Sequence, residues 1–213
     1  MLSGGGNFRK DETLDIDSSV LSRTVSHAPL AYLWSAGDIE SADEYLEYLQ
    51  DLGGRTGFLM DVTGEDDTSI NEQLSEAGIV ILGDGIHPER LHDSLHNRQI
   101  VIDSIEQAFS TGATIYAQGQ IAPAFAAWTP SPMGLQPGLG WIRNAIIAAP
   151  YTDEYADKLK NWLQTMLPTA YGIGIERGSA LALSPNAEVE VWGNQGVKIV
   201  LGQNLASGMT GQE

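Results

Sequence analysis

Short apolar runs alternate with segments of helical periodicity along most of the 213-residue chain, and this alternation constrains the fold more than any other feature. Residues 29–35, 56–62 and 79–82 have the composition of buried strands. Apolar residues recur at helical spacing over 45–52, and residues 66–76 favour a surface helix. This order predicts an α/β fold of three layers, with a mainly parallel sheet and helices on both faces.

The C-terminal third favours a different arrangement, with one helix and several short strands. A helix is predicted over residues 153–166, where apolar residues fall on one side. Short strands are predicted at 144–149, 173–175, 179–183, 187–192 and 197–201. Turn residues at 184–186 and 193–196 predict antiparallel hairpins near the C-terminus. Neither a repeat nor a linker interrupts the pattern, so we expect a single domain over residues 1–213.

A sharp corner is predicted between residues 114 and 128. A β-branched and aromatic run leads into Gln118-Gly119-Gln120, and an alanine-rich helical pattern follows, so we expect strand, tight turn and helix. Many α/β hydrolases place their nucleophile at such a corner in the pattern Gly-x-Ser-x-Gly. Here the nucleophile position holds Gly119, which has no side chain to attack a substrate.

Composition excludes several classes of partner and chemistry. Eleven Lys and Arg residues against 28 Asp and Glu give a net charge of −17, which disfavours nucleic acid and anionic membrane surfaces. The absence of cysteine excludes disulfides, thiolate metal sites and a cysteine nucleophile. No apolar run reaches the ~20 residues needed to span a bilayer. We therefore expect a cytoplasmic protein without a cofactor.

Five glycine and aliphatic motifs occur in an order that resembles one peptidase family. They are Gly4-Gly5-Gly6, the helix over 45–53, the strand and glycine loop over 79–85, Gly138-Leu139-Gly140, and Gly172-Ile173-Gly174-Ile175-Glu176. Together they resemble the cyanophycinase and dipeptidase E family of serine peptidases, over nearly the whole chain. The resemblance implies a class I glutamine amidotransferase-like (flavodoxin-like) fold, in which the loop at 83–85 supplies a backbone donor to the oxyanion hole.

The chain departs from this family at the reactive positions. Gly119 stands where the family has its serine, and Pro150 lies near the place of the catalytic histidine. Glu176 keeps a carboxylate at the acidic position, but Arg177 follows where the family often has a second acid, and no histidine occurs after His96. A nucleophile and an oriented base are both required for serine hydrolysis. The resemblance therefore predicts a non-catalytic relative, a pseudoenzyme.

Ser35 offers an alternative nucleophile. It lies in Trp34-Ser35-Ala36-Gly37, where a strand could pass into a helix, and His27 is the nearest histidine in sequence. We interpret this segment as a turn or helix cap, with a hydrolase that uses Ser35 as the alternative.

Three histidines offer a second alternative, a metal site. His92 and His96 are four residues apart and would share one face of a helix, with His87 just before them. A divalent metal could bind there with Asp84 or Asp93. A polar surface helix without a ligand is the interpretation that we adopt.

The corner could still bind a ligand. Backbone N–H groups of the glycine loop and the glutamine amides could hold a carboxylate or a peptide end without cleaving it. The predicted ligand-binding residues are Gly83, Asp84, Gly85, Gln118, Gly119 and Gln120. A homodimer formed through faces that bear Trp128, Trp141 and Trp162 is a further candidate assembly.

Overall fold

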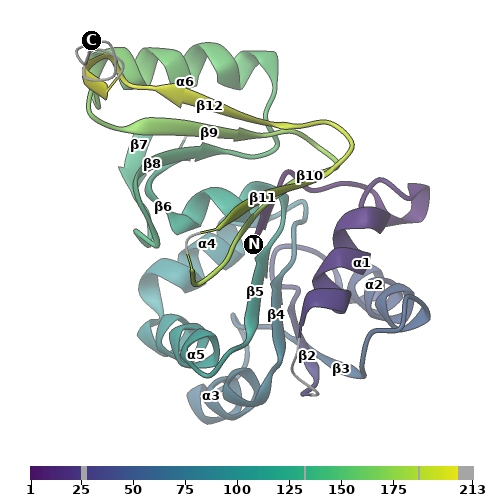
Figure 1. Ribbon diagram of the computed structural model, residues 1–213. Coiled ribbons are helices and arrows are strands. Elements are labelled where there is room, and N and C mark those ends of the chain that lie inside the picture. Colours follow the sequence, from purple (N-terminus) through teal and green to yellow (C-terminus); the bar gives the residue numbers. More distant parts are fainter. Residues whose placement is uncertain (25–27, 132, 187, 206–213) are drawn as a thin grey trace.

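The computed structural model describes residues 1–24, 28–131, 133–186 and 188–205, and Figure 1 shows two sheets with helices packed around them. The first sheet has seven strands in the order β11-β10-β1-β5-β4-β2-β3. Their bounds are β1 (Leu2–Ser3), β2 (Leu30–Leu33), β3 (Gly57–Met60), β4 (Ile79–Leu82), β5 (Thr114–Ala117), β10 (Ser179–Leu183) and β11 (Val189–Gly193). The second sheet has the order β12-β9-β8-β6-β7. Its strands are β6 (Ala126–Ser131), β7 (Gly134–Pro137), β8 (Ile142–Ala148), β9 (Tyr171–Ile175) and β12 (Val197–Leu201).

Helices cover both faces of the first sheet, as predicted. The helices of the described residues are η1 (Phe8–Lys10), α1 (Leu14–Arg23), α2 (Ile39–Asp51), α3 (Asp67–Glu76), α4 (Pro88–Asn97), α5 (Gln99–Ser110), η2 (Gly119–Phe125) and α6 (Asp153–Thr165), of which α6 packs against the second sheet. β1 to β5 are parallel, and β10 and β11 run antiparallel. Because successive strand residues point to opposite faces, Leu30 and Tyr32 pack with α1 and α2, whereas Ala31 and Leu33 pack in the cluster formed by α3, α4 and α5. The α/β class is therefore confirmed.

Five strands after the corner, β6 to β9 and β12, form a second sheet, whereas the sequence predicted a single one. β6 pairs in parallel with β8, and β8 with β9. Ile147 faces the large core shared with the first sheet, and its neighbour Ile146 faces Leu159 and Leu163 of α6. The C-terminal half of β8 and most of β9 are thus buried on both faces, which explains their apolar runs.

One predicted hairpin is confirmed and the other is wrong. β10 and β11 form an antiparallel hairpin, but β11 and β12 lie in different sheets, because β12 pairs with β9. The turn between them passes the chain from one sheet to the other. The Ser179 hydroxyl fixes this turn by accepting hydrogen bonds from the N–H groups of Gln195 (3.1 Å) and Gly196 (2.7 Å).

The helix predicted after the corner is also shorter than expected. Residues 119–125 form the 3-10 helix η2, and the chain then becomes strand β6. Pro123 lies inside η2 and has no N–H to donate to an α-helical hydrogen bond. Leu139 and Gly140 donate instead to the carbonyls of Ala124 (2.8 Å) and Ala126 (3.0 Å), which holds this segment in an extended path.

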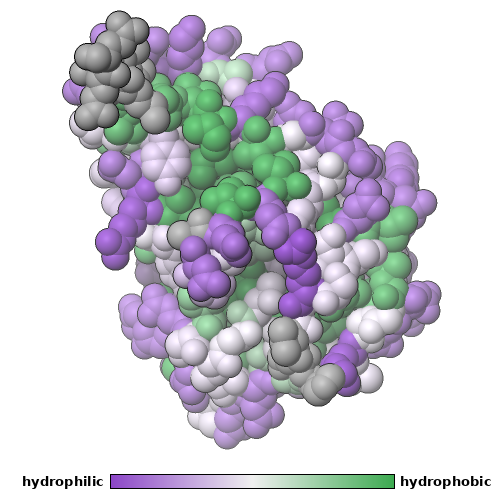
Figure 2. Space-filling view, viewed as in Figure 1, coloured by the Kyte–Doolittle hydropathy of each residue, from purple (hydrophilic) through white to green (hydrophobic). Residues whose placement is uncertain are grey.

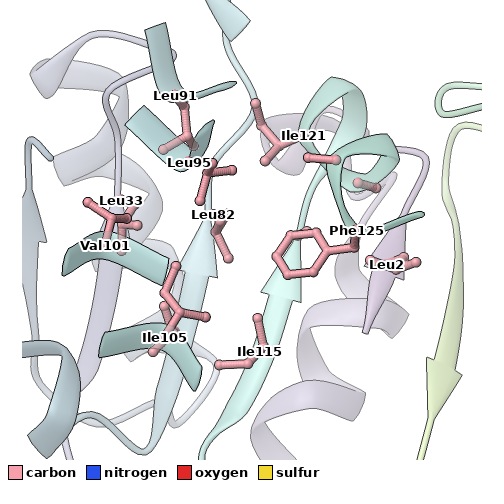
Figure 3. Close-up of a cluster of buried hydrophobic side chains, with 14 of the residues drawn as sticks. Leu2, Leu33, Leu82, Leu91, Leu95, Val101, Ile105, Ile115, Ile121 and Phe125 are labelled. Atoms are coloured by element: carbon pink, nitrogen blue, oxygen red, sulfur yellow. The ribbon is translucent and has the colours of Figure 1, made fainter. Parts of the chain in front are cut away.

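Figure 3 shows the main core packed beside the corner. Ile121 and Phe125 of η2 lie in the same buried cluster as Leu82 of β4 and Leu91 and Leu95 of α4. Burying side chains of this size contributes about 1.5–3 kcal/mol each, so the corner rests on a well-packed base.

The surface shows where apolar side chains remain exposed. Figure 2 shows an apolar area in the upper half of the molecule, where Figure 1 places β9 and β12. Ile199 and Leu201 of β12 are among the exposed residues. By contrast Trp128 and Trp162 are packed against the core of the second sheet, and the Trp141 ring lies 5.3 Å from that of Phe125. None of the helices in the described ranges is long and apolar enough to cross a membrane.

Candidate functional site

Three turns meet at the C-terminal ends of the neighbouring strands β1, β5 and β4. They are centred on Gly5, Gly119 and Asp84. A Cβ atom placed on Gly5 would lie 3.2 Å from the Gly119 Cα and 3.3 Å from Asp84 Oδ2. Ligands of open α/β sheets bind outside the carboxyl ends of the strands, so this convergence marks the candidate site.

Gly119 occupies a backbone conformation that other residues rarely adopt. Its φ is +49°, in the left-handed region, and a Cβ atom there would lie 1.8 Å from Asp84 Oδ2 and 2.4 Å from its Cγ. A hydrolase would place its nucleophile at this position. Here the Asp84 carboxylate occupies the space that the nucleophile side chain would need.

Asp84 also binds the backbone donors of the corner. Its Oδ1 accepts hydrogen bonds from the N–H groups of Gly85 (3.0 Å) and Gln120 (3.3 Å). In α/β hydrolases, the oxyanion hole uses the N–H that follows the nucleophile and a second N–H from a neighbouring loop. Burial raises the pKa of Asp84, while the bonds from Gly85 and Gln120 oppose that rise.

A cavity of about 150 Å³, which we call the elbow cavity, opens beside this carboxylate. Its polar side chains include Thr13, Ser41, Asp84 and Gln118, and four of its lining residues are aromatic. The aromatic residues are Phe8, Tyr32, Tyr45 and Tyr116. Tyr32 and Tyr116 flank Ile81 in register on adjacent strands, so their side chains project from the same face of the sheet.

A buried polar network holds these side chains in place. Gln118 Nε2 donates to the Tyr45 hydroxyl (2.7 Å), and the Tyr45 hydroxyl donates to Asp17 Oδ1 (2.8 Å). The Tyr116 hydroxyl donates to the same oxygen (3.2 Å). Asp17 is fully buried, and burial raises the pKa of its carboxyl above the ordinary value. Asp17 lies inside helix α1, whose N-cap is Thr13.

Ser35 lies apart from the elbow cavity's polar network. It is fully buried, and its hydroxyl donates to Asp61 Oδ1 (2.8 Å). Asp61 Oδ2 lies 3.9 Å from the Arg90 guanidinium. His27, the histidine nearest in sequence, lies outside the described residues. Ser35 therefore has a carboxylate partner and caps the loop after β3.

The three histidines do not converge on one point. His92 Nε2 donates to the carbonyl of Gln120 (2.9 Å), and both ring nitrogens of His96 contact carbonyl oxygens, those of His92 (2.9 Å) and Pro137 (3.2 Å). His87 contacts Glu89 instead. Within the described part of the chain, no group of three or more His, Cys, Asp or Glu side chains could hold a metal ion. Burial lowers the pKa of His92, which supports the corner from α4.

Glu176 lies in a second depression of about 430 Å³, which we call the Glu176 groove. Glu176 is paired with Lys198 (2.9 Å), and Arg177 with Glu12 (3.0 Å). Tyr151, which follows Pro150, also lines the groove. The Gly178 N–H donates to the Gly5 carbonyl (2.8 Å), so the groove and the elbow cavity flank the same glycine turn.

The tyrosines of the elbow cavity were not predicted as site residues. Tyr32 and Tyr116 occur in strand patterns and Tyr45 in a helical pattern, where aromatic residues ordinarily indicate core. One signal was available, because both strand tyrosines stand one residue before the last residue of their strands. A tyrosine there has its hydroxyl close to the ligand-binding edge of a parallel sheet.

Comparison with known proteins identifies the fold. No protein-family model and no curated protein sequence matches the chain. A crystal structure of a peptidase from an acI-B1 Actinobacterium is similar, with a TM-score of 0.71 and 21% sequence identity over 94% of this chain and 89% of that one. The chain therefore has a peptidase-like α/β fold. At this level of identity the likeness concerns the fold, and the roles of residues rest on the geometry of the site.

Proposed function

We propose that this protein is a non-catalytic relative of the cyanophycinase and dipeptidase E peptidases, which binds a small ligand at the elbow cavity without cleaving it. One observation carries the proposal: the Asp84 carboxylate lies where a nucleophile side chain would lie above Gly119. The resemblance to that family rests on the ordered glycine motifs, and the peptidase-like fold is consistent with it.

The donors of the corner support the same function. In a working hydrolase, backbone N–H groups are free to stabilise the negative charge that develops in the transition state. Here Asp84 Oδ1 already accepts the N–H groups of Gly85 and Gln120, so a substrate carbonyl would have to displace a carboxylate to reach them. Loss of a serine nucleophile alone lowers rates by roughly 10⁶ in a well-studied case.

The experiment measures cleavage by the purified protein. It uses a panel of Asp-X and β-linked Asp-Arg dipeptides, with products followed by mass spectrometry, and a fluorophosphonate probe for reactive serines. We expect neither turnover above the buffer control nor labelling. Turnover that disappears on a single substitution would contradict the proposal.

A matched variant tests the alternative hydrolase. Ser35→Ala removes the hydroxyl that a relocated mechanism would use and leaves the corner intact. We expect it to match the wild type in the dipeptide assay. Labelling of Ser35, or zinc bound in equal amount to the protein, would favour the alternative.

A further inference from the structure

The elbow cavity carries a negative charge that forms no ion pair with the described residues. Among the described residues that line it, Asp84 is the one with a formal charge, and none is lysine or arginine. Asp84, Asp17 and Asp38 all act on Tyr32, whose pKa is raised first by burial and then by these three charges. An anion entering the cavity would therefore meet repulsion, and a cation would be attracted.

Two arginines lie near the cavity, and each is paired with another acid. The Arg9 guanidinium is paired with Glu44 and stacks 4.7 Å from the centre of the Phe8 ring, on the cavity wall. Arg177 is paired with Glu12 in the Glu176 groove, although its charge still acts to lower the pKa of Asp84. Neither arginine forms an ion pair with Asp84, whose direct partners are the two N–H donors of the corner.

The walls of the cavity suit an organic cation. The rings of Phe8, Tyr32 and Tyr45 form a contiguous cluster, with centroids 5.2 Å apart for Phe8 and Tyr45 and 5.3 Å apart for Tyr32 and Tyr45. Aromatic faces attract ammonium groups through their quadrupole, most strongly where the contact is shielded from water. Because Tyr45 is held by Gln118 and Asp17, its ring is fixed before a ligand arrives.

We propose that the elbow cavity is a binding site for a small alkylammonium ion, with Asp84 Oδ2 as the anionic contact and the aromatic rings around the alkyl chain. This inference rests on the proposed non-cleaving function and names the chemistry of its ligand. The proposed ligand is a cation, whereas the sequence predicted a ligand with a carboxylate. The N–H groups expected to bind that ligand already donate to the carboxylate of Asp84, which lies in the same loop. A volume of about 150 Å³ suits a ligand of a few heavy atoms. The net charge of −17 favours the approach of cations.

The test uses three molecules with the same carbon chain: n-butylammonium, n-butanol and butyrate. Each is titrated into the full-length protein near neutral pH while backbone ¹H–¹⁵N resonances are followed. We expect saturable shifts of the Gly5, Gly6, Gly85 and Gln120 amides with butylammonium, weaker ones with butanol and none with butyrate. Equal or stronger binding of butyrate would overturn the proposal.

Two carboxylate variants locate the charge. Asp84→Asn keeps the shape of the side chain and should weaken butylammonium binding by about tenfold or more. Glu176→Gln makes the same change of net charge in the Glu176 groove and should leave the dissociation constant within about twofold. If both variants weaken butylammonium binding equally, the amine responds to the overall charge of the protein, and the proposed site at Asp84 would be overturned.

A wild-type measurement keeps the proposal falsifiable if Asp84→Asn does not fold. A bound cation must lower the apparent pKa of Asp84, followed through the Gln120 amide. Butylammonium that leaves this pKa unchanged would contradict the assignment. Peptide turnover, by contrast, would sink the proposed function and leave the cation site standing, so the two failures are distinguishable.

Discussion

The elbow cavity and the Glu176 groove flank the same glycine turn, but their acidic side chains have different partners. In the groove each acid has a cation: Glu176 pairs with Lys198, and Glu12 with Arg177. In the cavity Asp84 makes no ion pair with any described residue and is held by backbone N–H groups. Paired and solvated charges largely cancel, whereas a partly buried and unpaired one remains available to a ligand.

Protonation equilibria follow this difference. Burial is the leading influence on Asp84 and raises its pKa. The leading influence on Glu12 is the hydrogen bond from the Asn7 N–H, which lowers its pKa. Neighbouring acids are thus shifted in opposite directions, as is common where binding chemistry is located.

The largest expected effect comes from the network beneath the cavity. Asp17→Ala removes the acceptor of the Tyr45 and Tyr116 hydroxyls and leaves a void, so we expect a loss of about 3 kcal/mol in the free energy of unfolding. Urea denaturation followed by tyrosine and tryptophan fluorescence measures it. Asp15→Ala, on the same helix at an exposed position, is the control. Equal losses in both variants would remove the special role of the network.

The second effect tests whether Asp84 and position 119 share one space. Gly119→Ser adds a side chain at positive φ and displaces the carboxylate, and we expect it to cost about 2 kcal/mol. In an Asp84→Ala background the same substitution should cost less. The variant lacks Oδ2 and Cγ of Asp84, which would lie 1.8 and 2.4 Å from a Cβ atom on residue 119. A double-mutant cycle measures this coupling. Simple additivity of the two changes would show that the carboxylate does not fill the corner.

The third effect is a dependence of stability on pH that is specific to the buried acid. The folded pKa of Asp17 is raised above its ordinary 3.8, so the folded protein retains a proton that the unfolded chain has lost. The stability that this retained proton contributes is therefore fully present below pH 3.8, the pKa of Asp17 in the unfolded chain, and is lost as the pH rises through the folded pKa. The groups that face Asp17 are Tyr45, Tyr48, Tyr116 and Thr13.

Asp17→Asn isolates this contribution. The stability of the wild type relative to the variant should fall with rising pH, by about 1.4 kcal/mol for each unit by which the folded pKa exceeds the ordinary value. Urea midpoints measured from acid to neutral pH give the difference. A constant difference, or one that rises with pH, would contradict the assigned direction.

The smallest effect is expected in the groove. Lys198→Met removes the cation beside Glu176. The Lys198 side chain of this pair is 59% exposed to solvent, and that of Glu176 is 25% exposed. Exposed pairs contribute about 0–1 kcal/mol, so we expect a change of about 0.5 kcal/mol in the free energy of unfolding. A loss as large as that of Asp17→Ala would erase the contrast between the two regions.

Local pattern was enough to predict the first sheet. Strand β4 (Ile79–Leu82) is buried on both faces, as its continuous aliphatic sequence predicts. The second sheet was not predicted, although its strands β8, β9 and β12 were. The pairing of β12 with β9 follows a turn at 195–196 that the Ser179 hydroxyl holds, a contact between residues at least sixteen apart in sequence.

The candidate site likewise contains residues that local sequence predicts and residues whose role depends on contacts distant in sequence. Gly119 and the loop at 83–85 could be placed at the corner from sequence, because turn glycines follow predicted strands. The role of Asp84 could not, because it depends on the approach of two turns separated by thirty-odd residues. The tyrosines remained hidden since a buried aromatic and a cavity wall have the same sequence pattern.

The most direct test of the account follows the Gly85 and Gln120 amides by ¹H–¹⁵N spectroscopy during a pH titration of the ligand-free protein. If one carboxylate occupies the corner, both amides shift with a single common pKa above 3.8, and Asp84→Asn abolishes both transitions. Two unrelated titrations, or transitions that survive in Asp84→Asn, would show that the Asp84 carboxylate does not lie over Gly119.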